Sequence, residues 1–131
     1  MHLHLNQGKG VVSLDSSRES LHRRGYRPAM GLAPLKENLA AGLIHKTQWD
    51  GSIPLVDPLC GSGIFLIEAV SIFLGIPSGL NKSFLFEKWL DFDLNLWNEQ
   101  REIVKNMNLK NYNLPKIIGC EKDLDIANQA K

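Results

Sequence analysis

The segment PLVDPLCGSGIFLIEA, residues 54–69, places two apolar runs on either side of a short loop that contains Asp57, Pro58 and two glycines. The first run has the length and composition of a buried strand, and the second has those of a buried helix. A covered strand joined by a glycine turn to a covered helix is typical of the middle of a parallel α/β sheet. The segment therefore predicts a strand that ends at Asp57 and a helix over residues 63–74.

The segments on either side extend this pattern. Alternating apolar residues predict a leading β-hairpin from strands at 2–6 and 10–14. Helical spacing of apolar residues predicts helices within 33–49 and over 93–107. The segment KIIGCEKD, residues 116–123, predicts a short strand that runs into acidic residues, with a further helix beginning after it. Alternation of strand and helix indicates a parallel, doubly wound α/β sheet, of which two strands amount to about half.

Composition narrows the class of protein. The 131 residues are enough for one domain, and 44% hydrophobic with 22% charged residues is ordinary for a globular protein. A net charge of +1 gives no overall attraction for an anionic partner, which would need a local patch. No apolar stretch approaches the roughly 18 residues of a membrane span. Cys60 and Cys120 lack the spacing of a disulfide framework or a zinc site, so we expect a cytoplasmic protein without a metal.

The loop after the first strand has the chemistry of a small-molecule cradle. Gly61 and Gly63 can adopt backbone angles that are closed to other residues, and they let a ligand approach the main chain. A helix that opens at Gly63 presents unpaired N–H groups to a carboxylate or phosphate, whereas Asp57 favours an ammonium group. Donors for an anion beside a carboxylate for a cation suit an amino-acid moiety better than a pyrophosphate. The alternative to a ligand-binding loop is an ordinary structural turn between the strand and the helix.

The second strand also ends in carboxylates. A carboxylate after a β-strand commonly accepts hydrogen bonds from ribose hydroxyls, and Glu121 is the candidate for that role. Asp123 would lie nearer a base. An amino-acid moiety at one strand end and a ribose at the next together suggest S-adenosylmethionine. The alternatives are that Glu121 is a solvated acid at the start of a helix and that Asp123 is an N-cap.

A basic stretch, HRRGYR at residues 22–27, is a candidate for RNA contact. Guanidinium groups bind phosphates, and a tyrosine ring stacks on an unpaired base. The candidate residues are Arg23, Arg24, Tyr26 and Arg27. The alternative is a solvated loop whose charge is balanced by Asp15 and Glu19.

Four motifs, taken in order, resemble one family. LDSSRESLHRRGYR, APLKENLAAGL, DPLCGSGIFLIEA and FEKW are similar to segments of the bacterial large-subunit ribosomal RNA guanine-N2 methyltransferases, in which an RNA-binding THUMP domain precedes the catalytic domain. The resemblance implies a Rossmann-like domain that transfers a methyl group from S-adenosylmethionine to the N2 amine of a guanine in 23S rRNA. Direct transfer to an amine leaves Cys60 without a nucleophilic role.

The resemblance also implies roles for particular residues. The first cofactor loop would comprise Asp57, Cys60, Gly61, Ser62 and Gly63. Glu121 would bind the ribose and Asp123 the adenine side, while Lys36 and the backbone near Ala33 would close over the methionine end. The sequence departs from the family at Ile64, which stands where threonine is usual, and at Glu121, which stands where aspartate is more common.

The larger departure is an absence from the sequence. The family's Asn/Asp-Pro-Pro-aromatic loop, which holds the target amine, does not occur, nor does a THUMP domain. We therefore expect residues 1–131 to be a partial methyltransferase domain without catalytic residues, inactive alone. Residues 1–33 would form the hairpin and basic loop, and 34–131 the first half of the cofactor-binding core. Two alternatives stay open: a fragment similar to adenine-N6 DNA methyltransferases, which share the cofactor loop, and a truncated, non-catalytic product.

Overall fold

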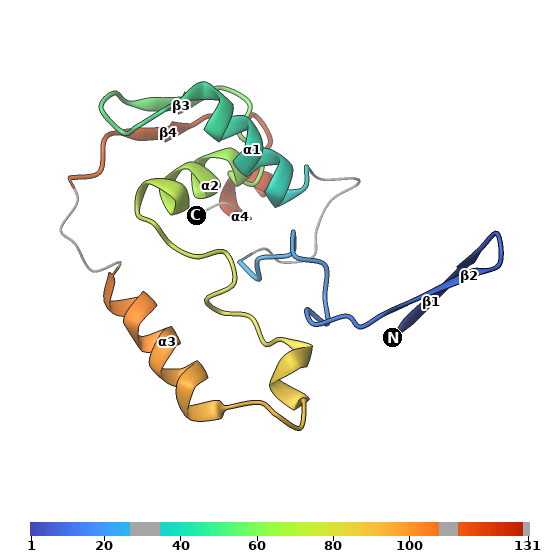
Figure 1. Ribbon diagram of the computed structural model, residues 1–131. Helices are drawn as coiled ribbons and strands as arrows, with labels where there is room; N and C mark the ends of the chain where they lie inside the picture. The colour runs from blue at the N-terminus through green and yellow to red at the C-terminus, as the bar shows by residue number, and fades with distance from the viewer. Residues whose placement is uncertain (27–34, 108–112, 130–131) are drawn as a thin grey trace.

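A computed structural model describes residues 1–26, 35–107 and 113–129 of the chain (Figure 1). The element order matches the sequence expectation, apart from a short 3₁₀ helix, η1, that the sequence did not predict. In chain order the elements are β1 (His2–Asn6), β2 (Lys9–Ser13), α1 (Glu37–Thr47), β3 (Leu55–Asp57), α2 (Ile64–Phe73), η1 (Leu85–Lys88), α3 (Leu94–Met107), β4 (Ile117–Gly119) and α4 (Leu124–Gln129).

Strands β3 and β4 form a parallel pair in which Leu55 lies opposite Ile117 and Asp57 opposite Gly119. The pairing continues past both strand ends, because the Cys120 N–H donates to the Asp57 carbonyl at 2.9 Å. The predicted parallel sheet is thus confirmed, with two strands in the described part of the chain. Its extension brings the loop after β3 beside the residues after β4.

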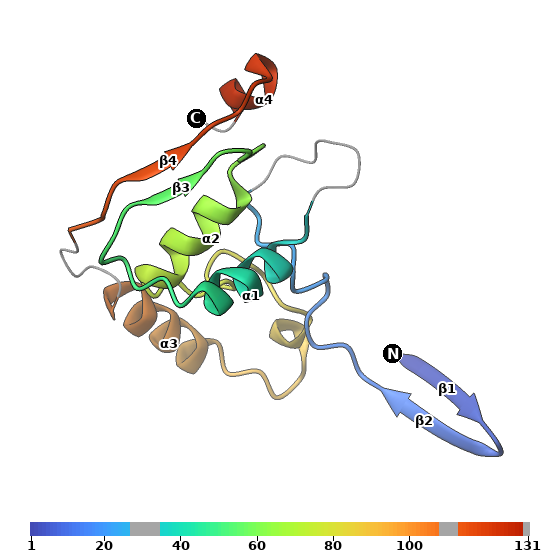
Figure 2. The ribbon, with the colours of Figure 1, turned by 90° about the horizontal axis from the view of Figure 1, so that it is seen from above.

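Helix α2 packs on the sheet, and α1 packs on α2, as the view from above shows (Figure 2). The two helices approach closely because small residues lie where they meet: Ala40 and Ala69 are fully buried. Ile44 and Ile64 complete the buried apolar set among the described residues. This small core fixes the direction of α2 relative to the sheet, and therefore the position of the loop at its start.

The N-terminal hairpin extends away from the rest of the structure (Figures 1 and 2). Its turn consists of Gln7 and Gly8, whose φ angles are 46° and 75°, the left-handed geometry that a two-residue hairpin turn requires. All residues of both strands are exposed, Leu3 and Leu5 included. The predicted hairpin is confirmed, and it contributes nothing to the core around α2.

A second, aromatic cluster joins η1 to α3. The ring of Trp97 lies edge-on to Phe84 and Phe86, with centroids 5.9 Å and 5.1 Å away. Arg101 lies 5.9 Å from the Trp97 ring and donates to the Leu80 carbonyl at 2.9 Å. The cluster lies beyond α2, away from the sheet (Figure 1). No helix within the described ranges is long and apolar enough to cross a membrane.

Candidate cofactor-binding site

The loop between β3 and α2 has the conformation that its glycines allow. Gly61 and Gly63 have φ angles of 54° and 77°, both in the left-handed region. The Gly63 N–H donates to the Cys60 carbonyl at 2.8 Å, which closes the turn. Helix α2 then begins at Ile64, and no side chain caps it. Because the first turn of a helix leaves N–H groups without intrahelical partners, this end of α2 can receive an anionic group.

Asp57 contributes an acceptor beside the loop. Its Oδ1 accepts a hydrogen bond from the Leu59 N–H at 3.1 Å, which orients the carboxylate. Its Oδ2 is buried and has no hydrogen-bond partner in the described structure. Burying an unpaired carboxylate oxygen costs free energy unless a donor satisfies it. The geometry therefore leaves one oriented acceptor for a ligand that carries a donor such as an ammonium group.

Glu121 connects the two strand ends. Its Oε2 accepts from the Gly61 N–H at 3.0 Å, and its Oε1 accepts from the Asp123 N–H at 2.9 Å. The parallel pairing makes this contact possible, because residues 60 apart in sequence meet at one edge of the sheet. The two strand ends that the sequence singled out thus form one continuous site.

Cys60 packs below the loop. Burial, together with the negative charges of Asp57 and Glu121, raises the pKa of its thiol above the usual value. The thiolate is therefore disfavoured, and Cys60 is a packing residue here. A Cβ on Gly119 would lie 2.8 Å from both the Cys60 Sγ and Leu66 Cδ1. Sequence reasoning missed Gly119, whose only signal was a glycine at the end of an apolar strand.

The remaining predicted cofactor residues lie at the edges of this site. Asp123 caps α4, since its Oδ1 accepts from the Asp125 N–H at 2.9 Å and the Ile126 N–H at 3.3 Å. Ser62 is half-buried within the loop. Lys36 is exposed at the N-cap of α1 without a side-chain capping bond. Ala33 lies outside the described residues.

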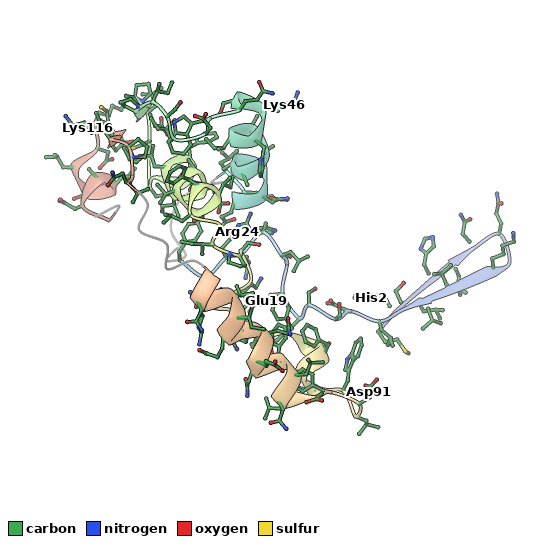
Figure 3. The ribbon with its side chains drawn as sticks, turned by 60° about the vertical axis from the view of Figure 1, so that its left-hand side comes forward. His2, Glu19, Arg24, Lys46, Asp91 and Lys116 are labelled. Atoms are coloured by element: carbon green, nitrogen blue, oxygen red, sulfur yellow. The ribbon has the colours of Figure 1, made fainter. Side chains whose placement is uncertain are left out.

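The residues of the basic stretch before α1 differ in how far they are exposed to solvent. Arg23 is exposed, and Arg27 lies outside the described residues. Arg24 and Tyr26 instead turn toward Glu68 on α2: the Arg24 Nε lies 3.0 Å from Glu68 Oε1, and the Tyr26 hydroxyl donates to the same oxygen at 2.7 Å. Figure 3 labels Arg24 where this loop meets α2. Of the described members, Arg23 is the one that an RNA phosphate could reach from solvent.

Sequence reasoning also missed the role of Glu68. Its side chain is 3% exposed, and it is the one charged residue of α2, in which Ser71 is the other polar residue. An acid on a buried helix face requires a partner, and that was the available signal. As for metals, no group of three or more histidine, cysteine or acidic side chains in residues 1–26, 35–107 and 113–129 is arranged to hold a metal ion.

Comparisons with known proteins agree on the kind of domain. The family model described as UPF0020, RMKL-like, methyltransferase domain matches residues 24–131. The ribosomal RNA large subunit methyltransferase K/L of Cellvibrio japonicus is 44% identical over 135 residues, which cover 97% of this chain. That match covers 18% of the length of the Cellvibrio protein. A Synechocystis relative is 43% identical, and this chain covers 33% of its length. The chain therefore spans a minor part of these relatives.

Two solved structures share the fold. A predicted N6-adenine-specific DNA methylase from Listeria monocytogenes superposes with a TM-score of 0.81 at 40% sequence identity, over 89% of this chain and 30% of its own. SMU.472, described provisionally as a methyltransferase and complexed with SAH, superposes with a TM-score of 0.77 at 38% identity, over 88% of this chain and 30% of its own. At these identities the likeness extends to the sequence as well as to the fold.

Proposed function

The chain belongs to the UPF0020 family of RMKL-like methyltransferase domains, and from this we propose that it is the S-adenosylmethionine-binding half of an RNA methyltransferase. We further propose that the parent protein methylates the N2 amine of a guanine in 23S rRNA. The observation that carries the proposal is the joined site at the ends of β3 and β4, where a buried Asp57 carboxylate oxygen without a hydrogen-bond partner lies at the start of the loop whose Gly61 N–H donates to Glu121.

The residues present fit this cofactor. The Oδ2 of Asp57 would accept a hydrogen bond from the ammonium group of the cofactor's methionine part. The N-terminus of α2, which has no side-chain cap, would face the carboxylate of that same part. Glu121 would accept the ribose hydroxyls, and Asp123 would lie toward the adenine. Lys36, and the backbone near Ala33, would close over the methionine end. When bound, the cofactor supplies an activated methyl group.

The residues of this chain act by binding and orientation. Direct transfer needs the donor and the accepting amine in line, so positioning supplies most of the rate. The packed Cys60 and the Glu121 bridge hold the loop in one conformation before any ligand arrives. The groups that hold the target base would come from the Asn/Asp-Pro-Pro-aromatic loop of the family, which this sequence lacks. We therefore propose that the 131 residues alone bind cofactor without catalysing transfer.

Calorimetry with S-adenosylhomocysteine on the full-length protein tests the cofactor site. Asp57→Asn keeps the size of the side chain but removes the charge that pairs with the ammonium group. A charge-assisted hydrogen bond of about 1.5–3 kcal/mol predicts roughly a 10- to 100-fold loss of affinity. Asp50→Asn is the matched control. Asp50 Oδ1 accepts a hydrogen bond from the N–H two residues later, that of Ser52, just as Asp57 Oδ1 accepts one from the Leu59 N–H. Asp50 lies in the turn before β3, away from the proposed cofactor site. An Asp57→Asn protein with unchanged affinity would overturn the assignment.

A second candidate substrate is adenine N6 in DNA. The likeness to the Listeria structure, described as a predicted N6-adenine-specific DNA methylase, favours it. The likeness to large-subunit rRNA methyltransferases favours RNA. Nucleoside mass spectrometry on a deletion strain separates the two. We expect N2-methylguanosine to disappear from one position of 23S rRNA while N6-methyladenine in DNA is unchanged; the opposite result would assign the DNA activity.

A further inference from the structure

Glu121 makes more contacts with the protein than a ribose acceptor needs. We propose that Glu121 is a positioning residue for the glycine loop. One carboxylate would then bind the ribose at the adenosine end of the site and hold in place the loop that binds the amino-acid end. The proposal rests on the proposed function for its ligand, but its structural part concerns the ligand-free protein alone.

Packing does not hold Gly61 in place. A Cβ built on Gly61 would meet nothing within 4 Å beyond its two chain neighbours, and the adjacent Cys60 thiol donates to the Gly61 carbonyl at 3.6 Å, which is a weak hydrogen bond. Its φ angle of 54° is one that glycine leaves readily, since other backbone regions are equally open to it. The Gly63 N–H closes the turn on the Cys60 carbonyl, and the hydrogen bond of 3.0 Å from the Gly61 N–H to Glu121 Oε2 is the contact that ties Gly61 itself to the chain after β4.

Glu121 is itself fixed from the other side. Its Oε1 accepts from the Asp123 N–H at 2.9 Å, and the Cys60 N–H donates to the neighbouring Cys120 carbonyl at 2.9 Å. The carboxylate is thus anchored to the chain after β4 before it contacts the loop. Because a charged acceptor strengthens a hydrogen bond, this bridge is stronger than a neutral contact between two loops.

The bridge leaves capacity for a ligand. Each carboxylate oxygen has about two lone-pair sites, and the described structure uses one on each oxygen of Glu121. Two acceptor sites remain for the two ribose hydroxyls. Binding of the ribose does not require the Gly61 bond to break. Glu121 can hold the loop and the ribose at the same time.

Side-chain length separates the positioning role from the ribose role. Glu121→Asp keeps the charge, and an aspartate can still accept from the N–H two residues on, as Asp57 and Asp93 do. It withdraws the carboxylate from Gly61 by one methylene. Glu121→Gln keeps the length of the side chain, but its amide has a single carbonyl oxygen to accept from the two N–H groups, of Gly61 and Asp123, that the carboxylate binds with separate oxygens. Asp125→Asn is the matched control, because it removes one negative charge from an exposed residue of α4.

The first measurement is amide hydrogen exchange of Gly61 in the ligand-free, full-length protein. We expect exchange at Gly61 to be about tenfold faster or more in Glu121→Asp and Glu121→Gln, and unchanged in Asp125→Asn. The Ile67 N–H, which donates to the Gly63 carbonyl inside α2, reports whether each variant is folded. Wild-type exchange at Gly61 in both Glu121 variants would overturn the proposal, whatever the protein binds.

The second measurement compares two ligands, adenosine and S-adenosylhomocysteine, by calorimetry. If Glu121 only accepts the ribose, Glu121→Asp weakens both ligands by the same factor. If it also positions the loop, S-adenosylhomocysteine, which carries the amino-acid group, loses about tenfold more affinity than adenosine. Equal losses would overturn the positioning role. Failure of the wild-type protein to bind S-adenosylhomocysteine would instead refute the proposed function and leave the exchange result standing.

Discussion

The guanidinium Nε of Arg24 lies 3.0 Å from Oε1 of Glu68, and the side chains of the pair are 15% and 3% exposed. The contact is an ion pair without hydrogen-bond geometry at Nε, and the Tyr26 hydroxyl supplies the hydrogen bond to the same oxygen. The pair fastens the loop before α1 to the middle of α2, the helix that follows the glycine loop. The basic stretch thus has a structural role that its charge alone did not indicate.

Removing Glu68 should destabilise the fold. Glu68→Ala leaves the guanidinium of Arg24 mostly buried without a counter-charge, and loss of one partner of a buried pair costs about 3 kcal/mol or more. Urea denaturation of the full-length protein measures this change in the free energy of unfolding. Glu102→Ala is the control, because Glu102 pairs with Lys105 on the surface of α3 and should change stability by less than about 1 kcal/mol. Equal effects of the two substitutions would contradict the role of Glu68.

The hydroxyl of Tyr26 should make stability fall at alkaline pH. Burial and the hydrogen bond to Glu68 raise the pKa of Tyr26 well above 10.0, its usual value. In the unfolded chain this tyrosine ionises near pH 10.0, while in the folded chain it stays protonated, so the unfolding free energy decreases as pH rises above that value. Tyr26→Phe should reduce the decrease, as urea titrations between about pH 8 and pH 11 can measure. An identical pH dependence in the variant would contradict the buried contact.

Gly119 should not tolerate a methyl group. Its Cβ would lie 2.8 Å from the Cys60 Sγ and from Leu66 Cδ1, so Gly119→Ala should cost about 1–3 kcal/mol through overpacking. Gly42→Ala is the control: Gly42 lies in α1 with nothing within 4 Å of its Cβ, and alanine there should stabilise by about 0.5–1 kcal/mol. Thermal or urea unfolding measures both. The double variant with Cys60→Ala should recover part of the loss, and no recovery would show that Cys60 does not pack against Gly119.

The open face of the sheet should make the 131-residue chain self-associate. Val56 and Ile118 are 54% and 39% exposed on the face away from α2, where a doubly wound sheet normally carries helices. We expect light scattering after size exclusion to find oligomers, and Val56→Thr with Ile118→Thr to raise the fraction of monomer. Leu90→Thr, at an exposed residue away from the sheet, is the control. A monodisperse wild-type monomer that unfolds cooperatively would contradict this prediction.

Much of this site followed from local patterns. Asp57, Gly61 and Gly63 stand out because a carboxylate and two glycines between apolar runs have few uses, and both glycines do have the left-handed φ angles that favour glycine. Arg24 shows the limit of such reading. A basic residue in a polar loop predicts solvent exposure, and only its buried partner, distant in the sequence, reverses that expectation.

The sequence by itself determined the order of elements, the parallel type of the sheet and the residues at the two strand ends, because periodicity, turn residues and the alternation of strand with helix can be read along the chain. The tertiary structure decided what those residues contact. The bridge from Glu121 to Gly61, the orphaned oxygen of Asp57 and the crowding around Gly119 all join segments about 60 residues apart or depend on burial. Such relations arise only when the sheet brings its strand ends together, since no local pattern specifies which distant group will satisfy a hydrogen bond.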